Sequence, residues 1–234
     1  MGKAGKMGCD DVDRNAASAD RDVRGLPRSG AVDTNRGACE IGGKKLMPIN
    51  PLDLTPAQIA KAFPGAPLAN IETHWPHVRA ELRSACLDSR MLVAYALATI
   101  AAESAGFKPI SEGVSKYNTN AAPFDLYNNR ESLGNGPADG ARYKGRGFVQ
   151  LTGRDNYSRY GARLGISLIN DPNKANDPAI AAQLLALFVA DRREAILSAL
   201  NASDFAKARR AVNGGTHGLA RFTNAYKAIL RAVQ

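Results

Sequence analysis

The chain has 234 residues, of which 44% are hydrophobic and 23% are charged, ordinary values for a soluble globular protein. This length predicts one globular domain of about 150–190 residues with a tail. No apolar run is long enough to span a membrane, and the formal net charge of +9 favours an anionic partner. Because no helix-turn-helix, RNP-type or zinc-finger pattern is present, we expect no nucleic-acid partner. The cysteines and histidines lack metal-ligand spacing, so we expect neither a metal nor another cofactor.

Residues 1–46 differ from the rest of the chain. They mix both signs of charge with Gly, Ala, Ser and Asp, and they contain no aromatic residue and no periodic apolar pattern. Such a segment cannot bury enough surface to offset its ordering entropy, so it is predicted to be disordered. It is either an upstream extension or an arm that touches the cell envelope, and the functional domain is predicted to span 47–234. The segment has no apolar h-region, so we expect synthesis in the cytoplasm without a recognisable signal peptide.

Helical patterns follow in order along the domain. Thr55 and Pro56 form a cap and first-turn pair that opens a short helix. Asp177 and Pro178 repeat this pair later in the chain, and Gly165 is placed to end the helix before it. The expected helices cover about 55–63, 69–86, 88–104, 154–164, 178–200, 204–213 and 219–229.

The domain is organised around the helix at 88–104 and the acidic residue near its end, Glu103. Leu92, Ala96, Thr99 and Glu103 follow one another at steps of four, three and four, which keeps them on one mostly apolar helix face. A carboxylate in apolar surroundings resists ionising, so Glu103 is predicted to hold a proton near neutral pH. That property suits a general acid for glycoside cleavage, whereas a carboxylate that turned outward at a frayed helix end would be structural.

The segment 105–147 is rich in Gly, Asn and Pro and is too long for a mere connection between helices. Loops of that length are usually functional. The alternation in residues 148–152 then predicts a short strand with Gln150 and Thr152 on one face. The expected fold is therefore mainly α, α+β and lysozyme-like, with a helical lobe, a small loop and β lobe, and a substrate cleft between them.

Three segments together resemble glycoside hydrolase family 19, which comprises chitinases and related phage and bacterial endolysins. They are ATIAAESAGFKPISE at 98–112, GPADGARYKGRGFVQLTGRDNY at 136–157, and AVNGGTHGLARFTNAY at 211–226. The second is long and highly specific. Ala102 and Ala105 stand where plant-type chitinases have His and Thr, and the plant set of cysteines is missing. These departures favour the endolysin branch.

The resemblance implies that Glu103 is the general acid of an inverting mechanism. A second carboxylate must then activate water, at about 6.5–9.5 Å from the first. Glu112 is the candidate, since endolysin-like members carry an acid after the Gly-Phe turn. Plant-type chitinases place their base later in the chain, so Asp125 and Glu131 stay open as alternatives.

Further residues of the motifs are implied to bind sugar or water. For Asn213 a plain helix-ending Asn-Gly turn is an alternative, and Tyr143 and Arg221 could instead be structural. The implied substrate-binding set is Tyr143, Gln150, Thr152, Asn156, Asn213 and Arg221.

We therefore predict a monomeric endolysin-type glycosidase that cleaves β-1,4 bonds of peptidoglycan. Its basic charge suits an anionic cell wall better than neutral chitin, which is the alternative substrate. A wall-binding protein that has lost catalysis is the alternative from another class. The enzyme is expected to act on the cell wall, in the periplasm or outside the cell, after release from the cytoplasm.

Overall fold

The computed structural model describes residues 40–41, 44–45, 49–104, 106–213 and 215–234. The chain divides into two compact units, Met1–Pro48 and Ile49–Gln234. In the first, the structure describes β1 (Glu40–Ile41) and β2 (Lys44–Lys45), which pair antiparallel. The prediction that residues 1–46 are disordered falls almost wholly outside the described residues and stays a prediction.

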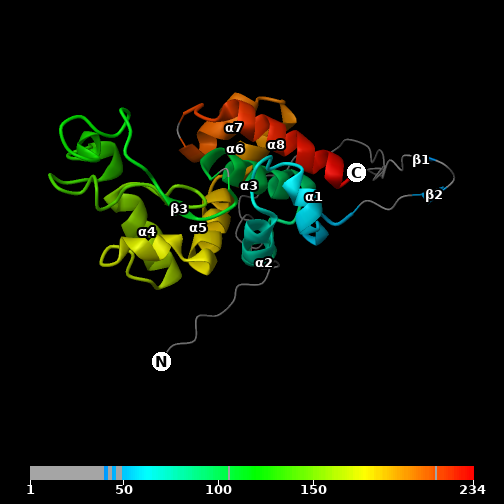
Figure 1. Cartoon of the computed structure of the whole chain (residues 1–234), viewed down its shortest axis with the longest axis horizontal. Helices are drawn as coiled ribbons and strands as arrows, with labels where there is room; N and C mark the ends of the chain where they lie inside the picture. The colour runs from blue at the N-terminus through cyan, green and yellow to red at the C-terminus, as the bar shows by residue number, and fades with distance from the viewer. Residues whose placement is uncertain (1–39, 42–43, 46–48, 105, 214) are drawn as a thin grey trace, which may run out of the picture. The chain divides into compact units, whose positions relative to one another are not determined.

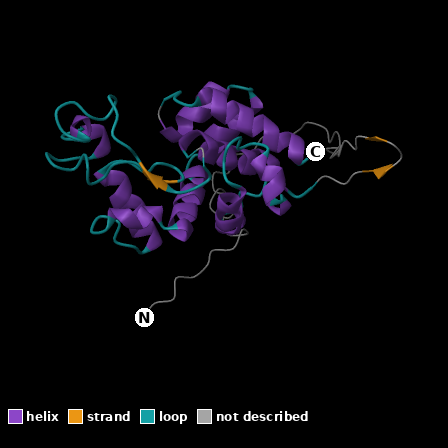
Figure 2. Ribbon diagram, in the orientation of Figure 1, coloured by secondary structure: helices purple, strands orange, loops and turns teal. Residues whose placement is uncertain are grey.

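The second unit is mainly helical, as the sequence predicted (Figures 1 and 2). Two antiparallel strands form its sheet, with Ile110 opposite Gly147 and Ser111 opposite Arg146. The elements are η2 (Pro51–Asp53), α1 (Pro56–Ala60), α2 (Leu68–Ser84), α3 (Arg90–Glu103), β3 (Ile110–Ser111), η3 (Asp125–Tyr127), η4 (Glu131–Leu133), β4 (Arg146–Gly147), α4 (Arg154–Leu164), η5 (Pro172–Asn176), α5 (Pro178–Ala190), α6 (Arg193–Asn201), α7 (Phe205–Asn213) and α8 (Leu219–Ala232).

Helix α3 lies in the middle of the helices and contacts α8, α5 and α6 (Figure 1). The Ser89 hydroxyl caps its start by accepting a hydrogen bond from the Leu92 amide. Every residue from Leu92 to Ala102 is buried, so the helix is enclosed on all sides rather than along one apolar face. A helix that is apolar all round belongs in the centre of a core, and α3 anchors the lobe in this way.

Two helices begin at caps that the sequence predicted. Thr55 and Gln58 form a capping box at α1, and the Asp177 carboxylate accepts from two amides at the start of α5. Helix α2 continues through Pro76.

The predicted single helix over 178–200 is wrong, because α5 and α6 are separated at Asp191 and Arg192. The Asp191 carboxylate accepts from the Tyr160 hydroxyl and from Arg163, while the Arg192 guanidinium lies 3.8 Å from the centre of the Phe188 ring. The two contacts to Asp191 come from α4, 31 and 28 residues away along the chain, so local sequence could not indicate them.

The predicted strand over 148–152 is also wrong. The strand is Arg146–Gly147, and the next residues turn back so that Arg146 and Leu151 exchange backbone hydrogen bonds of 3.2 and 2.9 Å. Gly147 and Gln150 both have a left-handed backbone, at φ 78° and 51°. The alternation of polar and apolar residues in this stretch comes from a tight turn rather than from an extended strand.

Candidate active site

A cleft of about 490 Å³ opens beside the end of α3. Its walls come from α3, from the loop after it, from the 146–151 turn, and from α4, α5, α7 and α8. Within the part of the chain that the structure describes, no group of His, Cys, Asp and Glu side chains is placed to hold a metal ion. The lining residues are Ala102, Glu103, Glu112, Tyr127, Leu133, Val149, Gln150, Thr152, Asn156, Phe188, Val212, His217 and Arg221.

Glu103, the predicted acid, is the last residue of α3 and lines this cleft. Its side chain is 13% exposed, and its Oε1 accepts a 2.6 Å hydrogen bond from Nη2 of Arg209. The sequence had predicted apolar surroundings for this carboxylate. That prediction is incomplete, because its partner in the structure is a cation.

Arg209 is the largest fully buried side chain of the described residues, with 0% exposure. Its Nε donates to the His217 carbonyl at 3.0 Å, so one guanidinium joins α7, the end of α3 and the segment before α8. The Tyr95 hydroxyl of α3 donates to the Ala208 carbonyl at 2.8 Å and fixes α7 beside it. Sequence reasoning missed Arg209 because it stands 106 residues from Glu103.

Glu112, the predicted base, lines the same cleft from the loop that follows β3. Its Oε1 accepts from the Tyr127 hydroxyl and from the Asn118 amide, both at 2.8 Å. Its Oε2 accepts from the Gly145 amide at 3.1 Å. A carboxylate that accepts three hydrogen bonds is held in a single position, so Glu112 is oriented by the protein before substrate binds.

A side chain at Gly145 would crowd Gln150 and Glu112. A Cβ at this position would lie 2.8 Å from Oε1 of Gln150 and 3.2 Å from Oε2 of Glu112. The glycine therefore lets the backbone amide approach the carboxylate closely.

The two alternative bases are not among the residues that line the cleft. The Asp125 carboxylate accepts from the backbone amides of residues 120–122, and these hydrogen bonds lower its pKa. Glu131 is exposed in the first turn of η4. Of the three candidates, only Glu112 shares the cleft with Glu103.

Gln150, Thr152 and Asn156 all line the cleft. Gln150 does so from the turn, where its amide nitrogen donates to the carbonyls of Ile110 and Gly147 at 3.0 Å. The Thr152 hydroxyl donates to a backbone carbonyl at 2.9 Å, and so does the Asn156 amide at 2.8 Å. The structure brings these three together with Glu103 and Glu112, although through a turn and a helix instead of a strand face.

Of the remaining predicted residues, Arg221 lines the cleft from α8. Tyr143 does not, since its ring is 1% exposed in the core and its hydroxyl lies 3.4 Å from the Ile169 carbonyl. The side chain of Asn213 lies outside what the structure describes. Sequence reasoning did not single out Tyr127 and His217, because isolated polar residues in loops carry no periodic signal.

Solved structures with a similar fold are chitinases by their descriptions. The chain is similar to chitinase C from Streptomyces griseus HUT6037, with a TM-score of 0.53 and 22% identity over 75% of this chain and 91% of that one. A second structure, described as a bacterial family 19 chitinase that differs from the plant enzymes, matches with a TM-score of 0.53 and 21% identity over 76% and 94% of the two chains. The predicted mainly helical fold is thereby confirmed.

Sequence comparison gives a likeness to a protein of the family that the motifs resemble. A Haemophilus influenzae protein described as a "Glycosyl hydrolase family 19 domain-containing protein" is 32% identical over 108 residues. The match covers 45% of this chain and 50% of that protein, so the chain spans about half the length of the curated relative it matches. No family model matches the chain. The resemblance to glycoside hydrolase family 19 is confirmed by this relative over the matched 108 residues, and the solved structures confirm the fold.

Proposed function

We propose that this chain hydrolyses β-1,4 glycosidic bonds of peptidoglycan by an inverting general acid and base mechanism. The observation that carries the proposal is the pair of carboxylates in one cleft. Glu103 stands at the end of α3, and Glu112 belongs to the loop lobe, which is the segment between α3 and α4. An inverting glycosidase needs one such group to protonate the leaving oxygen and another to activate water on the opposite face of the sugar.

Glu103 is the proposed acid. Arg209 occupies its Oε1, and among the described residues no hydrogen bond to its Oε2 is found. Oε2 is therefore the oxygen that would carry the proton to the glycosidic oxygen, while the guanidinium holds the carboxyl group in place.

Glu112 is the proposed base. Its three hydrogen bonds hold the carboxylate in one position, from which it can accept a proton from water. The polar side chains that line the cleft beside it, Gln150, Thr152, Asn156 and Arg221, are the proposed contacts to the sugar and to that water.

Peptidoglycan is the first choice of polymer because the chain is basic, with a formal net charge of +9. Arg221 lines the cleft, and the stem peptides of peptidoglycan carry carboxylates that a guanidinium attracts. Chitin is the second candidate, favoured by the likeness to two solved structures that are described as chitinases.

The biological setting belongs to the same proposal. An endolysin, of phage or bacterial origin, would be made in the cytoplasm and act on the wall after release. No helix among the described residues has the length and apolar character to cross a membrane.

The test compares wild type with Glu103→Gln and Glu112→Gln on purified peptidoglycan and on chitin. We expect loss of at least about 100-fold in reducing-end release for either variant, since general acid and base groups contribute factors of 10² to 10⁴. Proton NMR of the first products should show the inverted anomer. Mass spectrometry of the fragments identifies the polymer and the bond. Wild-type binding to the wall without product formation would instead support a non-catalytic wall-binding protein, and undiminished cleavage by Glu103→Gln would refute the acid assignment.

A further inference from the structure

The loop lobe contains a chain of hydrogen bonds that ends on the proposed base. The Tyr127 hydroxyl donates to Oε1 of Glu112 at 2.8 Å. Partial burial and the hydrogen bond to Glu112 raise the pKa of Tyr127 above its ordinary value. The phenol therefore keeps its proton, and remains a donor, throughout the pH range in which a glycosidase works.

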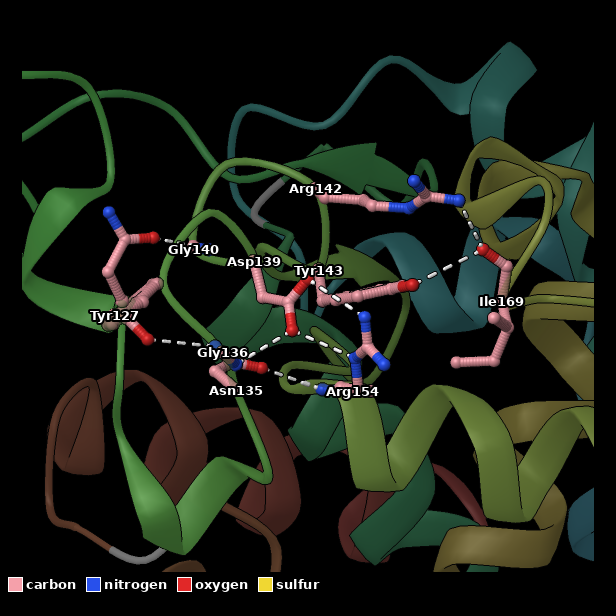
Figure 3. Close-up of polar contacts among 10 residues, drawn as sticks. Tyr127, Asn135, Gly136, Asp139, Gly140, Arg142, Tyr143, Arg154 and Ile169 are labelled. Atoms are coloured by element: carbon pink, nitrogen blue, oxygen red, sulfur yellow. Dashed lines mark hydrogen bonds and ion pairs between the residues drawn. The ribbon is translucent and has the colours of Figure 1, made fainter.

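Tyr127 is itself held through its backbone by Asn135 (Figure 3). The Asn135 amide nitrogen donates to the Tyr127 carbonyl at 2.9 Å, and Oδ1 of the same side chain accepts from the Arg154 amide at 2.8 Å. Asn135 is 7% exposed, so little water competes for these hydrogen bonds.

The contact with Arg154 pairs a backbone amide at the start of helix α4 that would otherwise lack an acceptor. Its N-cap residue is Gly153, which has no side chain to accept from the first amides of the helix. Asn135 supplies that acceptor from 19 residues away. The start of a rigid helix is thus tied to the backbone of Tyr127 by one amide side chain.

An ion pair keeps Asn135 in this position. The Asp139 carboxylate accepts from the Gly136 amide and from Nε of Arg154, both at 2.8 Å (Figure 3). The turn that carries Asn135 is therefore closed on one side by Asp139 and docked on α4 on the other.

We propose that Tyr127 is a positioning residue for Glu112, and that Asn135 fixes Tyr127 by clamping its backbone to the start of α4. The proposal rests on the proposed function and deepens it. Without the phenol, Glu112 keeps its hydrogen bonds from Asn118 and Gly145 but loses the one from Tyr127. The carboxylate would then be held less firmly in its orientation toward the attacking water.

The first test is Tyr127→Phe, with Tyr160→Phe as the matched control. Tyr160 also donates to a carboxylate, Oδ2 of Asp191 at 2.9 Å, but it does not line the cleft. Tyr127→Phe should lower the rate at the pH optimum about tenfold. The acidic limb of its pH–rate profile should move up by about one pH unit, because a carboxylate that loses a donor takes up a proton at higher pH. Tyr160→Phe should leave the profile where it is.

The charged and titratable groups that share the cleft with Glu112 and Tyr127 are unchanged in both variants, so they cannot produce the difference. They are Glu103 on α3, His217 before α8 and Arg221 on α8, with Arg130 lying 5.9 Å from the centre of the Tyr127 ring.

The second test is Asn135→Asp. The new carboxylate still accepts from the Arg154 amide, but it places an acceptor against the Tyr127 carbonyl. This variant should show the same shift of the acidic limb as Tyr127→Phe. The double variant should be no slower than Tyr127→Phe alone if Asn135 acts through the tyrosine.

All rates are measured as reducing-end release from the polymer that wild type cleaves, at a temperature where circular dichroism shows each variant folded. A Tyr127→Phe profile that superimposes on that of Tyr160→Phe overturns the positioning role. If Asn135→Asp keeps the wild-type profile while Tyr127→Phe shifts, the clamp is wrong. If Glu112→Gln is active, the proposed base itself fails, which is a separate outcome.

Discussion

Replacing Arg209 by methionine tests whether a buried ion pair holds the acidic end of α3 in place. Arg209 is fully buried, whereas Glu103 is 13% exposed at the cleft. Met fills most of the space of the aliphatic stem but removes the 2.6 Å hydrogen bond to Glu103 and the 3.0 Å hydrogen bond to the His217 carbonyl. The carboxylate is then left at the cleft without its cation.

Removing one partner of a buried pair costs about 3–5 kcal/mol in general. Two features of this pair make the expected loss of stability smaller than that general cost. Glu103 can be hydrated from the cleft. Nη1 of Arg209 has no hydrogen-bond partner among the described residues, so an unsatisfied buried donor is lost with the side chain. We therefore expect Arg209→Met to lower the free energy of unfolding by about 2–3 kcal/mol, which is about 4–12 °C in Tm for a domain of this size.

The assay is urea and thermal unfolding of Arg209→Met, Glu103→Gln and the double variant. The double variant should be more stable than the sum of the single losses predicts, because neutralising Glu103 removes the stranded charge. Arg210→Met is the matched control, since Arg210 is exposed on the same helix and should change stability by less than about 0.5 kcal/mol. Additive losses, or an Arg209→Met variant as stable as the control, would refute the buried-pair argument.

Two further predictions concern the loop lobe. Arg154 and the Gly136 amide outweigh the opposing effect of burial and hold the pKa of Asp139 below its ordinary value. This carboxylate therefore stabilises the fold above its unfolded pKa, and the contribution is lost as pH falls through the lower folded pKa. Asp139→Asn should lower Tm by about 2–4 °C at pH 7, with the difference from wild type shrinking below about pH 4 in pH-resolved thermal scans. Gly153 has φ 91°, and a Cβ there would lie 2.7 Å from the Leu133 carbonyl, whereas Gly65 has φ 87° with open space around it. Gly65→Ala should cost about 1 kcal/mol of unfolding free energy and Gly153→Ala roughly 2–4 kcal/mol, and equal losses in urea unfolding would contradict the clash.

Local signals in the sequence located the elements that depend on neighbouring residues. The capping box of Thr55 and Gln58 and the Asp177 cap mark helix starts because the groups that they satisfy lie within three residues. The apolar run of α3 predicts a core helix for the same reason, and Glu103 at its end could be singled out before any tertiary contact was known.

The stretch 146–152 is a place where local sequence signals predicted the wrong backbone conformation. Polar and apolar residues alternate there, yet Gly147 and Gln150 adopt left-handed backbones and the chain folds back on Arg146. The placement of Gln150 at the cleft was nonetheless consistent with the motif. A sequence motif indicates which residues lie together at a site, but it does not indicate the backbone conformation that brings them there.

By itself, the sequence determined the mainly helical class, the central helix, the acid at its end and the likeness to family 19 enzymes. Only the tertiary structure decided which groups those acids meet. Arg209 reaches Glu103 across 106 residues, and Tyr127 reaches Glu112 from another part of the loop. Helix caps and apolar periodicity act over a few residues along the chain, whereas the partners of a buried carboxylate are chosen by how distant segments pack.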